Sequence, residues 1–205
     1  MPSPRYRILC VDDDHDTCEV LELSNPYLRF TFAHTFASGL EYIRGGPFDL
    51  YVLDSWLPDG SGLDLCREIR RTDSTTPVVF LSAAAYVQDH QRAIEEGASA
   101  YLDKPTDLYR IEAVMNSLIW EAETKSLGAK VAAVSVLRED VEQRCLELAG
   151  QTSINRERMI RADEQVLRAR AYSAFRDSGG LNAHFERLWP NILDEILAAK
   201  AANSE

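Results

Sequence analysis

Short apolar runs recur along about the first 120 residues, and helical patterns separate them. The runs lie at residues 7–11, 29–32, 50–53, 78–81 and 98–102. Strands of a parallel sheet that is covered on both faces have this character, because both sides of each strand are buried. The intervening stretches carry apolar residues at helical spacing and end at proline or glycine, as helices do. The pattern therefore predicts repeated strand–helix units.

Five such units predict an α/β fold with a five-stranded, doubly wound parallel sheet, since strand–helix–strand crossovers are right-handed and place helices on both faces. Ligands bind such sheets at the carboxyl ends of the strands. Polar side chains stand at or just beyond those ends, namely Asp12, Asp13, Asp54, Ser82 and Lys104. We expect these side chains to converge on one cleft.

Carboxylates that share one small cleft repel one another unless a cation neutralises them. The cleft has no accompanying pattern of Cys or His ligands, so a hard, oxygen-seeking ion such as Mg2+ is predicted. With that ion present, Asp54 can act as a nucleophile towards phosphorus. Lys104 supplies a positive charge to the phosphoryl oxygens and Ser82 a hydroxyl donor. These residue types predict a Mg2+-dependent aspartyl phosphate.

The segments that carry these residues resemble the receiver domain of two-component response regulators. They are residues 8–14 (ILCVDDD), 53–62 (LDSWLPDGSG), 79–83 (VFLSA) and 101–105 (YLDKP). The resemblance extends from residue 6 to about residue 120. It implies a flavodoxin-like sheet with strand order 2-1-3-4-5. It also implies a phosphoacceptor signalling protein rather than an enzyme, with a histidine kinase or phosphotransfer protein as the phosphoryl donor.

The same resemblance implies a role for each matching residue. The implied metal ligands are Asp12, Asp13, Asp54 and the backbone carbonyl of Trp56. The implied residues of phosphoryl chemistry are the phosphoacceptor Asp54, the phosphoryl-binding Lys104 and the hydroxyl of Ser82. Ser82 and Tyr101 are the implied switch residues, and the Lys104–Pro105 peptide bond is expected to be cis.

Two positions depart from the usual receiver pattern. Ser82 stands where the family often has threonine, which keeps the hydroxyl but loses the methyl group that restricts its rotamer. Trp56 is bulky for a position two residues beyond the phosphoacceptor. We expect its side chain to shade Asp54 from attacking water and so to lengthen the lifetime of the phosphorylated state.

Any one of these side chains alone has an ordinary structural explanation. A single aspartate after a strand usually caps a helix, and we expect Asp14 or Asp16 to cap the first one. A haloacid-dehalogenase-like phosphatase also uses a strand-end aspartate, Mg2+, a hydroxyl and a lysine. Its general acid is an aspartate two residues after the nucleophile, where this chain has Trp56. That enzyme class is therefore the less favoured alternative.

Residues 125–205 are predicted to form an all-α extension of no recognised family. No proline-rich or glycine-rich linker follows the fifth helix, so that helix is expected to continue. An apolar stripe indicates a short coiled coil or a packed amphipathic helix: Leu127, Val131, Val134, Val141, Cys145 and Leu148. Further helices are expected at residues 154–175 and 181–202. Three-helix packing, a homodimer or a partner protein would cover their apolar faces.

The distribution of charge argues against nucleic acid as the main partner. Residues 1–124 carry 10 basic and 21 acidic side chains, whereas residues 125–205 carry 12 of each. The acidic part repels phosphate backbones, and the neutral part attracts them only weakly. Residues 156–176 hold a local excess of arginine but no helix-turn-helix signature. A DNA-binding transcription factor is therefore the second candidate for the output, after protein interaction.

Composition and cysteine spacing set the expected compartment. With 45% apolar and 27% charged residues, the chain is expected to be soluble and globular. It has no apolar run of about 18 residues, no secretory signal pattern and no C-x-x-C spacing. We therefore expect a cytoplasmic protein with no membrane partner. Residues 1–124 are predicted to be a receiver domain, and residues 125–205 a helical region for interaction or dimerisation.

Overall fold

The computed structural model describes residues 6–83, 87–148, 159–161, 163–180 and 182–198. The chain forms two compact units, Met1–Ala122 and Glu123–Glu205. None of the described helices combines the length and the hydropathy that a membrane span requires.

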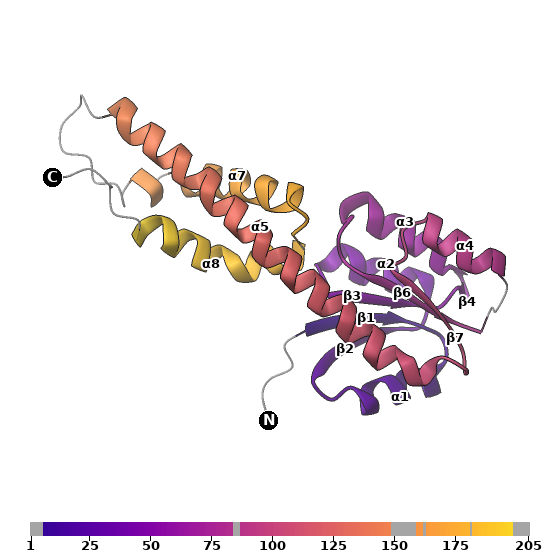
Figure 1. Ribbon diagram of the computed structural model, residues 1–205. Helices are drawn as coiled ribbons and strands as arrows, with labels where there is room; N and C mark the ends of the chain where they lie inside the picture. The colour runs from indigo at the N-terminus through magenta and orange to yellow at the C-terminus, as the bar shows by residue number, and fades with distance from the viewer. Residues whose placement is uncertain (1–5, 84–86, 149–158, 162, 181, 199–205) are drawn as a thin grey trace. The chain divides into compact units, whose positions relative to one another are not determined.

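A five-stranded parallel sheet forms the centre of the first unit (Figure 1). Its strands are β1 (Tyr6–Val11), β2 (Leu28–Ala33), β3 (Leu50–Leu53), β6 (Val78–Ser82) and β7 (Ala100–Asp103). The order across the sheet is β2-β1-β3-β6-β7, and every neighbouring pair is parallel. This is the predicted order 2-1-3-4-5, because β4 and β5 belong to a separate hairpin. The predicted fold class is confirmed.

Helices cover both faces of this sheet, as a doubly wound fold requires (Figure 1). They are α1 (His15–Ser24), α2 (Phe36–Gly45), α3 (Gly62–Thr72), α4 (Val87–Glu95) and α5 (Ile111–Leu148), with a 3-10 turn at Leu108–Arg110 before α5. α5 is a single helix of 38 residues. The expectation that the fifth helix continues past residue 124 is confirmed.

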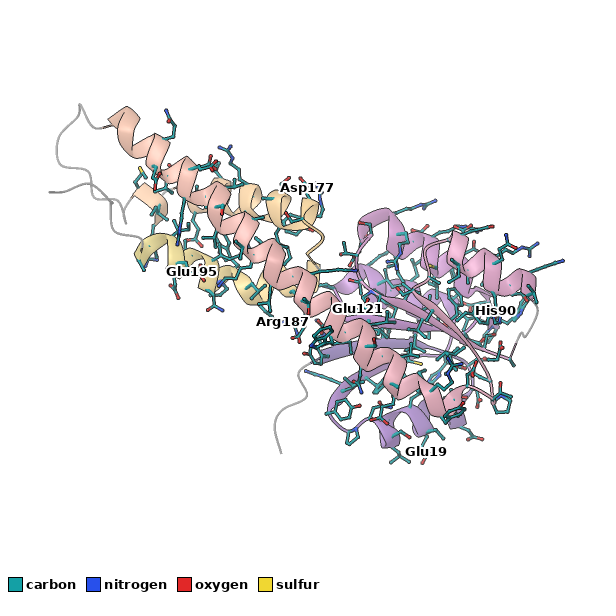
Figure 2. The ribbon with its side chains drawn as sticks, viewed as in Figure 1. Glu19, His90, Glu121, Asp177, Arg187 and Glu195 are labelled. Carbon is teal, nitrogen blue, oxygen red and sulfur yellow. The ribbon has the colours of Figure 1, made fainter. Side chains whose placement is uncertain are left out.

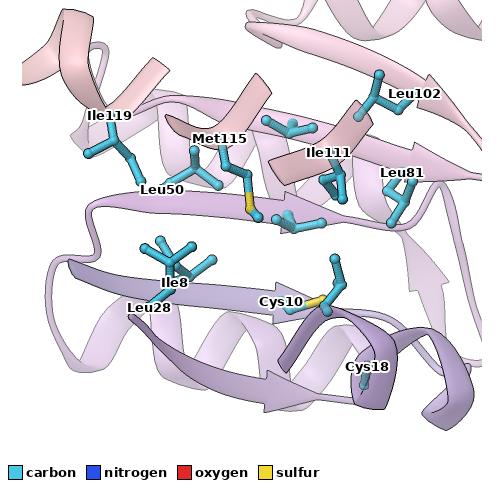
Figure 3. Close-up of a cluster of buried hydrophobic side chains, with 13 residues drawn as sticks. Ile8, Cys10, Cys18, Leu28, Leu50, Leu81, Leu102, Ile111, Met115 and Ile119 are labelled. Atoms are coloured by element: carbon cyan, nitrogen blue, oxygen red, sulfur yellow. The ribbon is translucent and has the colours of Figure 1, made fainter. Parts of the chain in front are cut away.

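Alternate residues of each strand enter two different cores. In β1, Ile8 and Cys10 pack with α1 and α5, whereas Leu9 and Val11 pack on the side of α2, α3 and α4. This alternation follows from the two-residue period of a strand. Figure 3 shows the first core, in which Met115 of α5 reaches the strands. Where both faces are buried, as at residues 8–11 of β1 and along β3, the strand is apolar at every position, and polar residues follow at the strand ends.

A short hairpin follows β3, where the sequence predicted only a turn. β4 (Trp56–Leu57) pairs antiparallel with β5 (Gly60–Ser61). Asp59 in its turn accepts hydrogen bonds from the backbone N–H groups of Phe36 (2.6 Å) and Ala37 (3.0 Å) at the start of α2. These bonds hold the pKa of Asp59 below its usual range. The hairpin is thereby tied to the first turn of α2.

In the described part of the second unit, the later part of α5 packs with α7 (Glu164–Asp177) and α8 (Asn182–Ala198). Their shared core includes Leu137 from α5, Phe175 from α7 and Phe185 from α8, all of them almost fully buried. α7 ends at Asp177 with Ser178 as its C-cap, and Gly179 follows with a positive φ of 83°, as the glycine pair had indicated. α8 runs through Pro190. Packing within the chain thus covers much of the predicted apolar surface.

The predicted stripe on α5 does not form one buried face. Leu127 and Val131 are 60% and 66% exposed, whereas Val134 and Val141 are buried. The buried face is completed by Ala129, Ala133 and Leu137. The heptad pattern followed the large apolar residues and overlooked the alanines, which are fully buried in the core shared with α7 and α8. The side chains of Cys145 and Leu148 lie outside the described residues.

The helix expected at residues 154–175 differs from the one observed. Residues 149–158 lie outside the part of the chain that the structure describes. Residues 159–161 are helical, a turn occurs at Asp163, and α7 begins only at Glu164 and continues to Asp177. Asp163 makes no side-chain cap to the new helix. The periodicity therefore located the helix but not the turn within it.

Candidate functional site

The register of the strands brings the polar strand ends to one edge of the sheet. Val11 of β1 lies level with both Ala33 of β2 and Leu53 of β3. Asp12 directly follows β1, and its N–H donates to the Ala33 carbonyl (2.9 Å). The Asp54 N–H donates to the Val11 carbonyl (2.9 Å). Backbone pairing alone therefore places Asp12 and Asp54 side by side.

Three carboxylates meet at this edge, as the sequence predicted. Asp12, Asp13 and Asp54 each offer an oxygen atom, and these atoms lie within 4.8 Å of one another. Asp12 is 1% exposed and Asp54 is 9% exposed, whereas Asp13 faces solvent. The Oδ1 atom of Asp54 is buried and has no hydrogen-bond partner among the described residues. Burial of a carboxylate oxygen without a hydrogen-bond donor costs free energy, and a bound cation would offset that cost.

Lys104 reaches the same carboxylates from the end of β7. Its Nζ lies 2.6 Å from Oδ2 of Asp12 and 3.6 Å from Oδ2 of Asp54. The backbone N–H of Lys104 donates to the carbonyl of Ser82 (2.8 Å), which ties the segment after β7 to the end of β6. The Lys104–Pro105 peptide bond is cis, as the resemblance implied.

Burial and pairing act in opposite directions on the two charged groups. Burial raises the pKa of Asp12, and the hydrogen bond and positive charge of Lys104 offset only part of that rise. Burial also lowers the pKa of Lys104, but its bond to Asp12 and the negative charges of Asp12 and Asp54 outweigh this effect, so that its pKa is raised. Lys104 therefore compensates only in part for the burial of the Asp12 carboxylate.

The two expected switch residues are neighbours on adjacent strands. Ser82 ends β6 and is fully buried, while the partly buried Tyr101 lies on β7. The Tyr101 hydroxyl is 3.1 Å from the hydroxyl of Ser55 and also hydrogen-bonds to Ser82. Burial raises the pKa of the Tyr101 phenol despite these bonds. The tyrosine is thus linked both to the switch serine and to the residue after Asp54.

Trp56 lies on β4, two residues beyond Asp54, and its side chain is 68% exposed. Its proposed effect on water access, and the role of its carbonyl as a metal ligand, stay predictions.

Some residues of this region had not been singled out. Ser55 contacts Tyr101, and Nδ1 of His34 lies 2.8 Å from the backbone oxygen of Asp12. Gly62 packs directly against the backbone of Asp54. Asp14, one of the two residues expected to cap the first helix, does cap α1 by accepting a bond from the Asp16 N–H. Only Gly62 carried a sequence signal, as the last glycine of the turn cluster after β3.

Comparison with known proteins agrees with this geometry. Residues 8–116 match the family described as the response regulator receiver domain. The chain belongs to this family. The match covers β1 to the first turns of α5 and includes every predicted site residue. The helical region that follows lies outside it.

Curated relatives are response regulators from several bacteria. An uncharacterized transcriptional regulatory protein of Bacillus subtilis, YkoG, is 33% identical over 121 residues, which are 58% of this chain and 53% of the relative. The response regulator PilR of Pseudomonas aeruginosa is 36% identical over 109 residues, or 52% of this chain and 24% of the relative. The chain matches about half of the length of the first of these relatives, and less of the second.

Solved receiver structures share the fold of the first unit. The non-phosphorylated HemR receiver domain of Leptospira biflexa is 35% identical, with a TM-score of 0.52. The match covers 56% of this chain and 94% of the HemR domain. The signal receiver domain of a putative LuxO repressor protein of Vibrio parahaemolyticus is 25% identical, with a TM-score of 0.57. The match covers 60% of this chain and 96% of that domain. The α/β unit therefore corresponds to an almost complete receiver domain.

Proposed function

We propose that this receiver domain accepts a phosphoryl group on Asp54 from a histidine kinase or a phosphotransfer protein, in a Mg2+-dependent reaction. One observation carries the proposal: Lys104 contacts Asp12 and lies near Asp54 in a cluster of three carboxylates at the carboxyl edge of the sheet. A lysine and clustered carboxylates on a rigid edge are the groups that phosphoryl transfer to an aspartate needs.

The donor set fits Mg2+ in kind and in number. Asp12, Asp13 and Asp54 supply hard carboxylate oxygens, and the backbone carbonyl of Trp56 is proposed as a fourth ligand. The buried Oδ1 of Asp54 has no partner in the described part of the chain, and a cation would satisfy it. When bound, Mg2+ would offset the negative charge of the carboxylates and of the phosphoryl oxygens.

The protein's own groups divide the remaining work. Asp54 forms the new O–P bond while the P–N bond to the donor histidine breaks and the imidazole takes up a proton. Lys104 provides a positive charge to the phosphoryl oxygens, and Ser82 offers its hydroxyl. Movement of Ser82 towards these oxygens would then be transmitted to Tyr101 through the bond between them.

We propose that the helical unit carries the output by protein interaction or by dimerisation. Arginines that could contact DNA are engaged within the unit: Arg170 pairs with Asp140 (3.0 Å), and Arg168 pairs with Glu186. DNA binding is the alternative, because relatives such as YkoG are named transcriptional regulators. Retention on duplex DNA that falls steeply with salt would favour the alternative, and the absence of retention at low salt would favour protein interaction.

The metal-dependent step is tested with beryllofluoride, a mimic of the phosphoryl group. Mg2+ and beryllofluoride together are expected to raise the thermal midpoint of the wild-type chain, because a ligand that binds only the folded state stabilises it. Asp13→Asn should weaken this response without loss of the fold, since Asp13 is exposed. Asp54→Asn should abolish it. An equal shift in Asp54→Asn and in the wild type would contradict the assignment.

Trp56→Ala is expected to speed loss of the phosphoryl group, because the large side chain stands two residues beyond Asp54. The measurement is the half-life of the phosphorylated protein, compared between the wild type and Trp56→Ala at the same Mg2+ concentration. Tyr42→Ala, which removes another exposed aromatic ring, serves as the control. An unchanged half-life in Trp56→Ala would remove the shading hypothesis.

A further inference from the structure

The ring of Tyr101 contacts two aromatic rings from different elements. The ring of Phe80, the register partner of Tyr101 on β6, is nearly parallel to it, with centroids 5.8 Å apart and planes at 6°. The imidazole of His90 in α4 is stacked at 4.0 Å with planes at 30°. The fully buried Phe80 belongs to the core of the sheet, whereas the side chain of His90 is 37% exposed. His90, which Figure 2 labels on α4, is therefore the more exposed of the two rings that contact the tyrosine.

His90 is itself held in place by a residue of the neighbouring strand. Its Nε2 lies 2.9 Å from Oδ1 of Asp103, which directly precedes Lys104. The N–H of the imidazole donates to this carboxylate, so the ring is fixed from α4 and from the end of β7 at once. A ring held at both ends loses little further freedom when it stacks on a neighbour. The contact between His90 and Tyr101 is thus pre-organised.

The hydroxyl of Tyr101 is held by two serine residues. It meets the Ser55 hydroxyl at 3.1 Å and also bonds to Ser82. If the tyrosine ring left this position for solvent, it would lose these bonds and both stacking contacts. Of the two ring contacts, His90 is the one near solvent, because Phe80 is fully buried in the core of the sheet, so removal of His90 is the change that would free the tyrosine to move outwards.

We propose that His90 is a positioning residue for Tyr101, which it holds with its hydroxyl against Ser55 and Ser82 before any phosphoryl group is present. This inference rests on the proposed function in one respect, the coupling of Tyr101 to an occupied Asp54 through Ser82. A contact that favours the conformer bound by a ligand also favours the ligand, by linkage. His90 therefore strengthens phosphoryl binding without touching the phosphoryl group.

The test measures the affinity for beryllofluoride in saturating Mg2+. His90→Ala is expected to weaken it about 2- to 10-fold, the range of one aromatic stacking contact. His90→Phe keeps a ring over Tyr101 and should stay close to the wild type. Gln91→Ala, which removes the neighbouring side chain on α4, should have no effect. In a Tyr101→Ala background, His90→Ala should change nothing, because its partner is gone.

A second measurement separates this inference from the proposed function. Ser55 and His90 both contact Tyr101, so Ser55→Ala should cost less unfolding free energy in a His90→Ala background than in the wild type. This coupling needs no phosphoryl mimic. Additive effects of the two substitutions, or an equal affinity loss from His90→Ala with and without Tyr101, would overturn the positioning role. Failure of the wild type to bind beryllofluoride would instead overturn the proposed function. The role of His90 would then be judged from the coupling between Ser55→Ala and His90→Ala in the unfolding free energy alone.

Discussion

Gly62→Ala is expected to lower the stability of the first unit by about 2–3 kcal/mol, the upper part of the range for overpacking a close-packed site. A Cβ atom at this position would lie 1.9 Å from the backbone oxygen of Asp54. That oxygen belongs to the backbone and cannot turn aside as a side chain would. The Gly62 N–H also donates to the Ser55 carbonyl (3.1 Å), which holds the two segments together. Relief of the clash must therefore displace the strand end that carries Asp54.

The same displacement should slow phosphoryl transfer to Asp54, since its carboxylate would leave the position set by Lys104. Urea unfolding and the rate of phosphorylation measure the two effects. Gly128→Ala is the matched control, because a Cβ at Gly128 meets nothing within 4 Å and the residue lies inside α5. Alanine should stabilise that helix by about 0.5–1 kcal/mol. A Gly62→Ala variant as stable and as reactive as the wild type would show that the close approach is not required.

Lys104→Met is expected to destabilise the Mg2+-free protein by about 3 kcal/mol, as loss of one partner of a buried ion pair does. The substitution leaves Asp12, which is 1% exposed, without the cation that lies 2.6 Å away in the wild type. Asp54 loses its neighbouring charge as well. Thermal or urea unfolding in EDTA measures this loss. Added Mg2+ should restore part of the stability, because a metal ion would replace the missing charge.

The pH dependence of this loss follows from the pKa of Asp12. Burial raises the pKa of Asp12 in the folded state above its pKa in the unfolded chain. Ionisation of Asp12 therefore opposes folding at high pH, and stability is regained as the pH falls through the folded-state pKa towards the unfolded one. Without Lys104 that pKa should rise further. The deficit of Lys104→Met should therefore be largest at neutral pH and should shrink towards acidic pH.

Lys130→Met provides the control for this substitution. Lys130 pairs with Glu195, whose side chain is 44% exposed. A pair of this kind contributes about 1 kcal/mol or less. Equal losses of stability from Lys104→Met and Lys130→Met in EDTA would contradict the view that the carboxylate cluster needs a buried cation.

The sheet could be predicted from the sequence because its chemistry leaves few alternatives. A strand covered on both faces must be apolar at every position, and Ile8 to Val11 satisfies this without interruption. The polar residues that end such strands must then meet at one edge, as Asp12 and Asp54 do. Sequence order therefore also indicated the candidate site.

Contacts between distant elements could not be predicted in the same way. Nothing in the sequence near His90 indicates that its ring meets Tyr101 and Asp103, since that contact depends on how α4 packs beside β7. The exposed Leu127 and Val131 show a related limit. Periodicity defines several faces of a long helix, and only the packing of its neighbours decides which face is buried.

Incubation with acetyl phosphate, followed by peptide mapping in a mass spectrometer, tests the central claim most directly. The account predicts one phosphoryl group per chain, located on Asp54, formed with Mg2+ and not after chelation by EDTA. Asp54→Asn should take up none. A phosphoryl group on another residue, equal uptake by Asp54→Asn, or uptake unaffected by EDTA would contradict it.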